Sequence, residues 1–286
     1  MTILKEGGNI FKTPEGPITQ RIGTGDVEST VQFLEKITGL DFTAEVDPTD
    51  KKPVKWLGST GRKEDPDGTF ELNSSGDLDL SVDLADAGKT DVIAKLVAWC
   101  KSQGIAETEI MNQGTKKTNG WVKDAGDQVH FRTPINGNAK NGFAQTDFMF
   151  TNNPKFQQGS MRGTGKGPYK GMHRMVILSS IARARGVKFS PKFGLVDPES
   201  NEPIPGGDNW TNIAKKLLGP SATEQTIRTP EAIIDFIKKL PNYEELIGAA
   251  RETLAKDGIE LPKAGQIESL ADKHLSRLKE LLGHGQ

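Results

Sequence analysis

The stretch DLDLSVD, which begins at Asp77, constrains the fold more than any other segment. Side chains of a β-strand point alternately to opposite faces, so Leu78, Leu80 and Val82 share one face while Asp77 and Asp79 share the other. Residues two apart on a strand are about 6.5 Å apart, twice the rise of about 3.3 Å. We therefore predict a half-buried strand that carries two neighbouring carboxylates on the face opposite the core.

Two carboxylates on one face repel each other unless a cation lies between them. Mg²⁺ favours carboxylate and phosphate oxygens, so a metal site is one interpretation. The other is a half-buried strand whose acids lie in water. A calcium loop of the EF-hand type is excluded, because it requires Gly at the sixth position, where this chain has Val82.

A third acid, Asp147, stands among apolar residues in the segment FAQTDFMF. A carboxylate on a buried strand is costly unless it has a partner. If this strand lies beside the Asp77 strand, Asp147 joins Asp77 and Asp79 as a third carboxylate. Three such acids can hold two metal ions about 3.5–4 Å apart, the arrangement that serves in-line phosphoryl displacement.

The pair Gly58-Ser59 follows a short apolar segment and precedes Arg62 and Lys63. Glycine permits close backbone approach, and free N–H groups with a Ser hydroxyl can hold phosphate oxygens. A guanidinium forms charge-assisted bonds to phosphate. These four residues are therefore candidates for binding a polyphosphate.

The chain changes character at a Gly-rich basic segment without acids. Helix patterns are expected in the segments that begin at Asp26, Thr90, Tyr169, Asn209, Thr229, Asn242 and Ile267. Asp26 is a candidate N-cap, and Thr229 followed by Pro230 is typical of a helix cap and first turn. Strand patterns are expected at residues 53–59 and 77–83 and between the helix that begins at Thr90 and the one that begins at Tyr169. We predict an irregular N-terminal arm at 1–25, a mixed domain at 26–152, a basic linker at 153–168 and a helical domain at 169–286.

The basic segment offers further candidates for nucleotide binding. Its GTGKG run fails as a Walker A loop, because Ser160 and Gly167 occupy two of the required positions. Lys166 either grips a triphosphate or acceptor, or belongs to a solvated linker. Lys170 and Arg174 share a helix face, which points either at the active site or at water.

Composition limits the classes of function. The 37 basic and 38 acidic residues nearly balance, which disfavours binding of nucleic acid by bulk charge. The single Cys100 lies in an apolar helix pattern and is expected to be a buried hydrophobic residue in a reducing compartment. We see neither a signal peptide nor a membrane span, and expect a cytoplasmic protein. The four His residues lack metal-ligand spacing, so no zinc site is expected.

The Gly58-Ser59 pair, the strand bearing Asp77 and Asp79, and Asp147 on a later strand resemble the nucleotidyltransferase superfamily typified by DNA polymerase beta. The chain also resembles nucleotidyltransferases of bacteriophage genomes. The likeness covers roughly residues 54–220. The later part is similar to the thumb of family X polymerases, which has an Arg-bearing helix, a glycine, a hairpin with a Gly-Leu pair and a helix ending in LLG; here these are Arg174, Gly186, Gly194-Leu195 and Leu217-Leu218-Gly219.

The resemblance implies an α+β fold, with a polymerase beta-like mixed sheet, flanking helices and a mainly helical thumb-like domain. It implies transfer of a nucleoside monophosphate from an NTP or dNTP to an acceptor hydroxyl, with two Mg²⁺ or Mn²⁺ ions on the three acids. The leading acceptor is a nucleic-acid 3′ end. A protein, a tRNA or a small molecule is the alternative acceptor, and a non-catalytic binding or structural protein is the alternative class. The long loop after Ser59 and the missing helix-hairpin-helix elements depart from the family pattern.

Overall fold

The computed structural model describes residues 10–47, 51–60, 74–111, 118–161 and 171–263. The chain divides into two compact units, residues 1–166 and 167–286, which are treated separately below. This division falls inside the segment predicted as a linker. The helix predicted after Ile267 lies outside the described residues.

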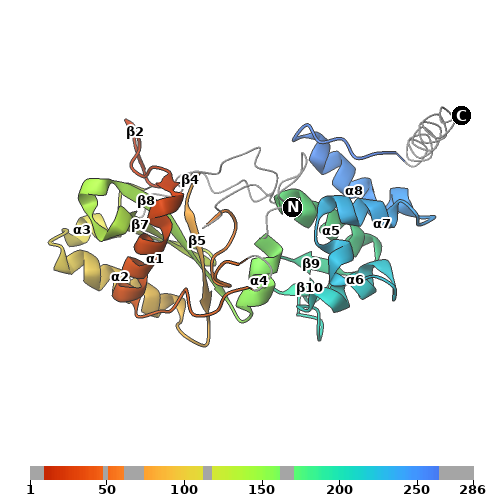
Figure 1. The fold of residues 1–286 in the computed structure, drawn as a ribbon, viewed down its shortest axis with the longest axis horizontal. Coiled ribbons are helices and arrows are strands. Elements are labelled where there is room, and N and C mark those ends of the chain that lie inside the picture. The colour runs from red at the N-terminus through yellow and green to blue at the C-terminus, as the bar shows by residue number, and fades with distance from the viewer. Residues whose placement is uncertain (1–9, 48–50, 61–73, 112–117, 162–170, 264–286) are drawn as a thin grey trace, which may run out of the picture. The chain divides into compact units, whose positions relative to one another are not determined.

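The first unit is built on a four-stranded mixed sheet in the order β5-β8-β7-β6 (Figure 1). β8 pairs in parallel with β5 and antiparallel with β7, and β7 pairs antiparallel with β6. The strands are β5 (Leu78–Asp83), β6 (Val122–Ala125), β7 (Gln128–Pro134) and β8 (Phe143–Thr151). The predicted strands from Leu78 onward are thus confirmed, although Asp77 lies just before the first residue of β5. The strand predicted at 53–59 is wrong, because this segment makes only isolated bridges, from Pro53 to Val46 and from Trp56 to Leu80.

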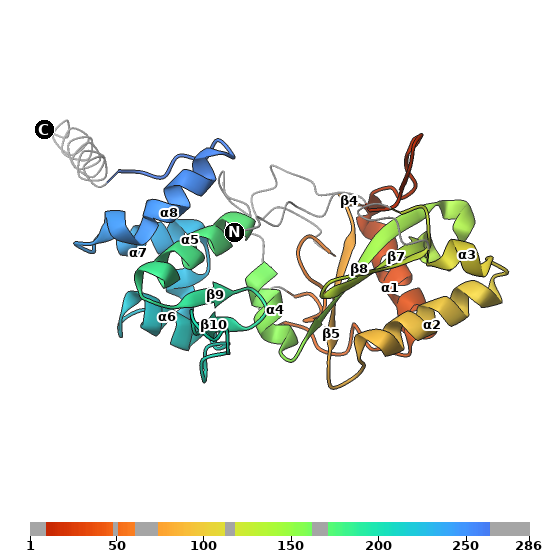
Figure 2. The same cartoon turned by 180° about the vertical axis from the view of Figure 1, so that it is seen from behind.

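Two helices, α1 (Thr24–Thr38) and α2 (Lys89–Ser102), pack on one face of this sheet (Figures 1 and 2). The core between them consists of buried apolar side chains from helices and strands, chiefly Val31, Leu34, Val92, Leu96, Leu78, Leu80, Phe131 and Phe148. The apolar positions of β5 face this core, as the alternation predicts. The opposite face of the sheet is therefore left for the polar residues.

Two details of these helices test the sequence interpretation. Asp26 is not the N-cap of α1, because the helix already begins after Gly23 and Asp26 lies in its first turn. Cys100 is fully buried in α2, and burial raises the pKa of its thiol to about 12. A thiol with so high a pKa is a poor nucleophile, so Cys100 is a core residue, as expected.

The predicted irregular arm is wrong for the described residues 10–23. Phe11 is fully buried, and the chain forms short pairs between β1 (Lys12–Thr13) and β2 (Gly16–Pro17). β3 (Ile22–Gly23) then pairs with β4 (Ser74–Ser75). Long-range pairing orders this segment, which its own Gly- and Pro-rich sequence does not reveal.

The predicted linker also differs, because residues Pro154–Met161 form α4. The Asn153 side chain accepts a hydrogen bond from the backbone N–H of Phe156 and caps this helix. Ser81 of β5 donates to Gln157 at 2.6 Å, which ties α4 to the sheet. Shorter elements of the first unit are α3 (Glu107–Ile110), η1 (Ile135–Gly137) and η2 (Ala139–Asn141).

In its described residues the second unit consists of helices and one short hairpin, in agreement with the predicted helical domain. The elements are α5 (Gly171–Ala184), β9 (Lys188–Ser190), β10 (Gly194–Val196), α6 (Trp210–Leu218), η3 (Glu224–Ile227), α7 (Pro230–Ile237) and α8 (Tyr243–Ala255). Thr229 caps α7 as predicted, because its hydroxyl accepts from the N–H of Ala232. Gly194 has a φ of +74°, and a Cβ there would lie 1.9 Å from the carbonyl oxygen of Gly207.

None of the helices in the described ranges has the length and apolar character needed to cross a bilayer.

Candidate active site

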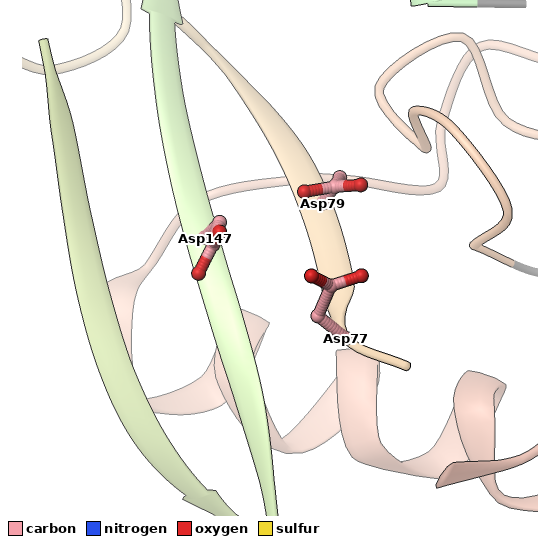
Figure 3. Close-up of side chains that lie close together, drawn as sticks. All are labelled: Asp77, Asp79 and Asp147. Atoms are coloured by element: carbon pink, nitrogen blue, oxygen red, sulfur yellow. The ribbon is translucent and has the colours of Figure 1, made fainter. Parts of the chain in front are cut away.

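Three carboxylates meet on the face of the sheet opposite α1 and α2. Asp79 of β5 lies directly beside Asp147 of β8 in the parallel register. Asp77 precedes β5 by one residue and points to the same side (Figure 3). One carboxylate oxygen from each acid lies within 4.8 Å of the others. The predicted convergence of the three acids is therefore confirmed.

The acids repel one another in a partly desolvated setting. Asp147 is 5% exposed, whereas Asp77 and Asp79 are half-buried. Burial raises the pKa of Asp79 well above its usual value, and the charges of Asp77 and Asp147 raise that pKa further. The positive charge of Lys52 opposes this shift. The site therefore favours either a proton on Asp79 or an added cation.

A tight turn at Leu57–Thr60 holds the backbone of Asp79. The N–H of Leu57 donates to the Asp79 carbonyl at 2.9 Å, and the N–H of Asp79 donates to the Thr60 hydroxyl at 2.8 Å. Gly58 has a φ of +53°, and a Cβ at this position would lie 2.8 Å from an Asp79 carboxylate oxygen. Glycine is thus required for conformation and for space against Asp79, and the predicted approach of this turn to phosphate stays a prediction.

Polar groups surround this turn. The hydroxyls of Ser59 and Ser75 are 2.7 Å apart and hydrogen-bonded. The ammonium of Lys52 donates to the Gly58 carbonyl at 3.2 Å. Hydroxyls and an ammonium beside three carboxylates form a setting suited to a ligand that brings both anionic oxygens and cations.

Among the described residues, two side chains form hydrogen bonds with Asp147. Nδ1 of His130 lies 2.7 Å from Oδ1 of Asp147, and Nε2 of Gln145 donates to the same oxygen at 2.9 Å. The register of β7 and β8 places His130 directly opposite Asp147. All three side chains are buried.

The donor set fits a hard divalent cation. Carboxylate oxygens are the ligands that Mg²⁺ and Mn²⁺ favour, and the described residues here offer three of them at sharing distance. Neither a thiolate nor an imidazole contributes to this group of three. The predicted ligand set of Asp77, Asp79 and Asp147 is therefore compatible with a divalent metal of this kind.

Of the basic residues predicted to bind the nucleotide, only Arg174 lies within the described part of the chain. Arg62, Lys63, Lys166 and Lys170 lie outside the described residues, so their roles stay predictions. Arg174 is only 3% exposed within the second unit. Its Nε donates to the Ile227 carbonyl at 2.7 Å, and its guanidinium stacks 4.5 Å from the centroid of the Trp210 ring. These contacts favour a packing role for Arg174 over its predicted role in nucleotide binding.

Sequence reasoning did not single out three residues around the acids, namely Lys52, His130 and Gln145. One signal for His130 was present. In QVHFRTP, the apolar Val129 and Phe131 alternate with His130, which therefore faces away from the core. Nothing comparable marks Lys52, whose proximity to Asp79 arises from the turn at Gly58.

No protein-family model matches the chain, and no curated protein matches it.

Proposed function

We propose that the protein is a metal-dependent nucleotidyltransferase, which transfers a nucleoside monophosphate from a nucleoside triphosphate to an acceptor hydroxyl. The observation that carries this proposal is the convergence of Asp77, Asp79 and Asp147 beside the Gly58-Ser59 turn. The raised pKa of Asp79 supports it, because a cluster of like charges gains from an added cation. The mixed sheet agrees with the expected fold type.

Asp77, Asp79 and Asp147 would hold two Mg²⁺ or Mn²⁺ ions. When bound, these ions supply charge neutralisation at the reacting phosphoryl group and activation of the acceptor hydroxyl. Gly58 and Ser59 lie next to Asp79, and the glycine lets the Asp79 carboxylate approach the turn; both residues are the predicted contacts of the β- and γ-phosphates. Lys52 adds a positive charge on the same side, and Arg62 is the predicted partner of the outer phosphates.

The transfer exchanges one bond to phosphorus for another. The acceptor oxygen bonds to the α-phosphorus, and the bond from that phosphorus to the oxygen bridging to the β-phosphate breaks. Pyrophosphate leaves with that bridging oxygen. The acceptor hydroxyl gives up its proton to Asp147 or to solvent. The residues around Asp79 keep the triphosphate oriented for in-line displacement.

A nucleic-acid 3′ end is the acceptor we favour. The expected likeness to a polymerase thumb supports this choice, and the second unit contains a helix (α5), a short hairpin (β9 and β10) and a further helix (α6) in that order. A protein, a tRNA or a small molecule is the alternative acceptor. A non-catalytic protein is less well supported. Such a protein has no need for three carboxylates that repel one another, nor for a glycine at position 58, where any larger residue would clash with Asp79.

The test is incubation with each α-labelled NTP and dNTP, Mg²⁺ or Mn²⁺, and separate pools of DNA, RNA and protein. We expect label on one pool and release of pyrophosphate, both lost on removal of the metal by a chelator. Thin-layer analysis of small molecules covers the remaining acceptor class. Absence of transfer and of pyrophosphate release with every triphosphate and pool would contradict the proposal.

A further inference from the structure

The hydrogen bonds on Asp147 are unevenly distributed between its two oxygens. Oδ1 has His130 Nδ1 at 2.7 Å and Gln145 Nε2 at 2.9 Å. An ionised carboxylate only accepts hydrogen bonds, so Nδ1 of His130 carries a hydrogen in this contact. The N–H groups of His130 and Gln145 then occupy both lone pairs of Oδ1.

The strand pairing and the N-terminal segment hold these donors in place. His130 lies opposite Asp147 in the antiparallel register, and Gln145 precedes Asp147 by two residues on the same face of β8. The backbone N–H of Ile10 donates to Oε1 of Gln145 at 2.9 Å. This bond fixes the direction of the Gln145 amide, so that its Nε2 points at Asp147.

Both hydrogen bonds that the described residues make with Asp147 fall on Oδ1, so Oδ2 is the oxygen that can face a ligand. We propose that His130 and Gln145 are positioning residues, which make Asp147 a one-oxygen ligand of a divalent cation. This inference rests on the proposed function. It adds that the site discriminates among cations, because Mg²⁺ and Mn²⁺ take six ligands in octahedral geometry whereas Ca²⁺ also accepts two oxygens of one carboxylate.

The burial of the network strengthens the inference. The side chains of His130 and Asp147 are 5% and 7% exposed, and Gln145 is 2% exposed. A carboxylate held by two buried donors has little freedom to rotate, so its second oxygen is presented in one direction. Hydrogen-bonded partners of metal ligands commonly change metal affinity by about 10- to 100-fold when they are removed.

The test compares two substitutions of one residue. His130→Asn keeps an N–H donor near the position of Nδ1, whereas His130→Leu keeps the size and removes the donor. Mn²⁺ alone and Ca²⁺ alone are titrated into each full-length protein by calorimetry, and a thermal melt without metal checks that each variant is folded. Gln145→Met, which removes the second donor, provides an independent variant if His130→Leu does not fold.

We expect His130→Leu to weaken Mn²⁺ binding by about tenfold and Ca²⁺ binding by less, so that the Mn²⁺-to-Ca²⁺ preference falls. His130→Asn should stay within about threefold of the wild type, and Gln145→Met should fall between. A purely structural role would lower the melting temperature without changing the preference between the two ions.

Unchanged Mn²⁺ affinity in folded His130→Leu and Gln145→Met would overturn the positioning role and leave the proposed function intact. An equal loss for Mn²⁺ and Ca²⁺ in both His130 variants would overturn it as well, because the donor would then not matter. Failure of the wild type to bind Mn²⁺ at millimolar concentration would overturn the metal-dependent function together with this inference.

Discussion

Both units bury charged side chains, but the partners of those charges differ. In the second unit, the Arg174 guanidinium meets the Ile227 carbonyl and the face of Trp210. In the first unit, Asp79 faces two further carboxylates, and burial with their charges raises its pKa. The contacts of Arg174 satisfy its charge within the protein, whereas the three acids of the first unit leave a surplus of negative charge at one point.

This difference separates a packing role from a binding role. A buried charge with carbonyl and aromatic partners stabilises the fold, and its removal lowers the free energy of unfolding. Like charges held together destabilise the fold without a cation, and removing one relieves repulsion. Such a cluster indicates a ligand of opposite charge, and perturbed carboxylates of this kind gather at functional sites.

The largest expected effect is on catalysis by Asp79→Asn. The ions are worth several kcal/mol of transition-state stabilisation, and each 1.4 kcal/mol is a factor of about ten in rate. We expect nucleotidyl transfer to fall by roughly 10³-fold or more. The melting temperature of the metal-free protein should stay the same or rise, because repulsion is relieved. Asp83→Asn, at the far end of β5, is the matched control and should keep its activity. Unchanged turnover in Asp79→Asn would remove this residue from the mechanism.

The opposite pattern is expected for Arg174→Met in the second unit. A hydrogen bond to a charged group is worth about 1.5–3 kcal/mol, and a cation–π contact adds about 0.5–2 kcal/mol. We therefore expect the free energy of unfolding to fall by roughly 2–4 kcal/mol, while triphosphate affinity changes less than about twofold. Denaturant unfolding and nucleotide titration measure the two quantities.

Arg174→Lys serves as the companion variant, because it keeps the charge and loses the planar group that stacks on Trp210. Its stability should lie between those of the wild type and Arg174→Met. A large loss of triphosphate affinity in a variant of normal stability would return Arg174 to the nucleotide site and weaken the contrast between the two units.

A smaller effect is expected for Gly58→Ala, which tests the approach of the turn to Asp79. The left-handed conformation costs an alanine about 1–2 kcal/mol, and the new Cβ would press on the Asp79 carboxylate. We expect Mn²⁺ affinity to fall by roughly tenfold, equivalent to about 1.4 kcal/mol. Gly126→Ala is the matched control, since Gly126 has a φ of +56° but no atom within 4 Å of the added Cβ.

Both variants should lose similar stability, and only Gly58→Ala should lose metal affinity. Calorimetric titration with Mn²⁺ and thermal melts of both proteins provide the comparison. Equal Mn²⁺ affinities would show that the contact between position 58 and Asp79 has no bearing on the metal site.

The smallest expected effect is a dependence of stability on pH. The folded, metal-free protein holds a proton on Asp79 up to a higher pH than the unfolded chain does, because its pKa is raised. The stabilisation from this proton is complete below the usual pKa of Asp, about 3.9, and is lost as the pH rises through the raised value. The melting temperature of Asp79→Asn relative to the wild type should therefore increase with pH.

Saturating Mn²⁺ should reduce this trend, because a cation favours the ionised carboxylate. Melting curves of both proteins across this pH range, with and without Mn²⁺, test the sign. A constant difference between the two proteins would mean that Asp79 titrates alike in the folded and unfolded chains.

The sequence by itself determined which residues share a face of each element. The alternation in DLDLSVD placed Leu78 and Leu80 in the core and Asp79 on the other face, and the cap at Thr229 marked the beginning of α7. These features are local, because the side-chain period of a strand and the unpaired N–H groups of a helix end depend on neighbouring residues alone.

Only the tertiary structure decided which of these faces meet. His130 lies opposite Asp147, Gly58 lies against the Asp79 carboxylate, and the N–H of Ile10 fixes Gln145, although 135 residues separate that last pair. Strand register and turn position depend on how the whole core packs, because shifting a strand by one residue would exchange its core and solvent faces. For this reason the three acids were predictable from their own strands, whereas the residues that hold them became visible only in the folded chain.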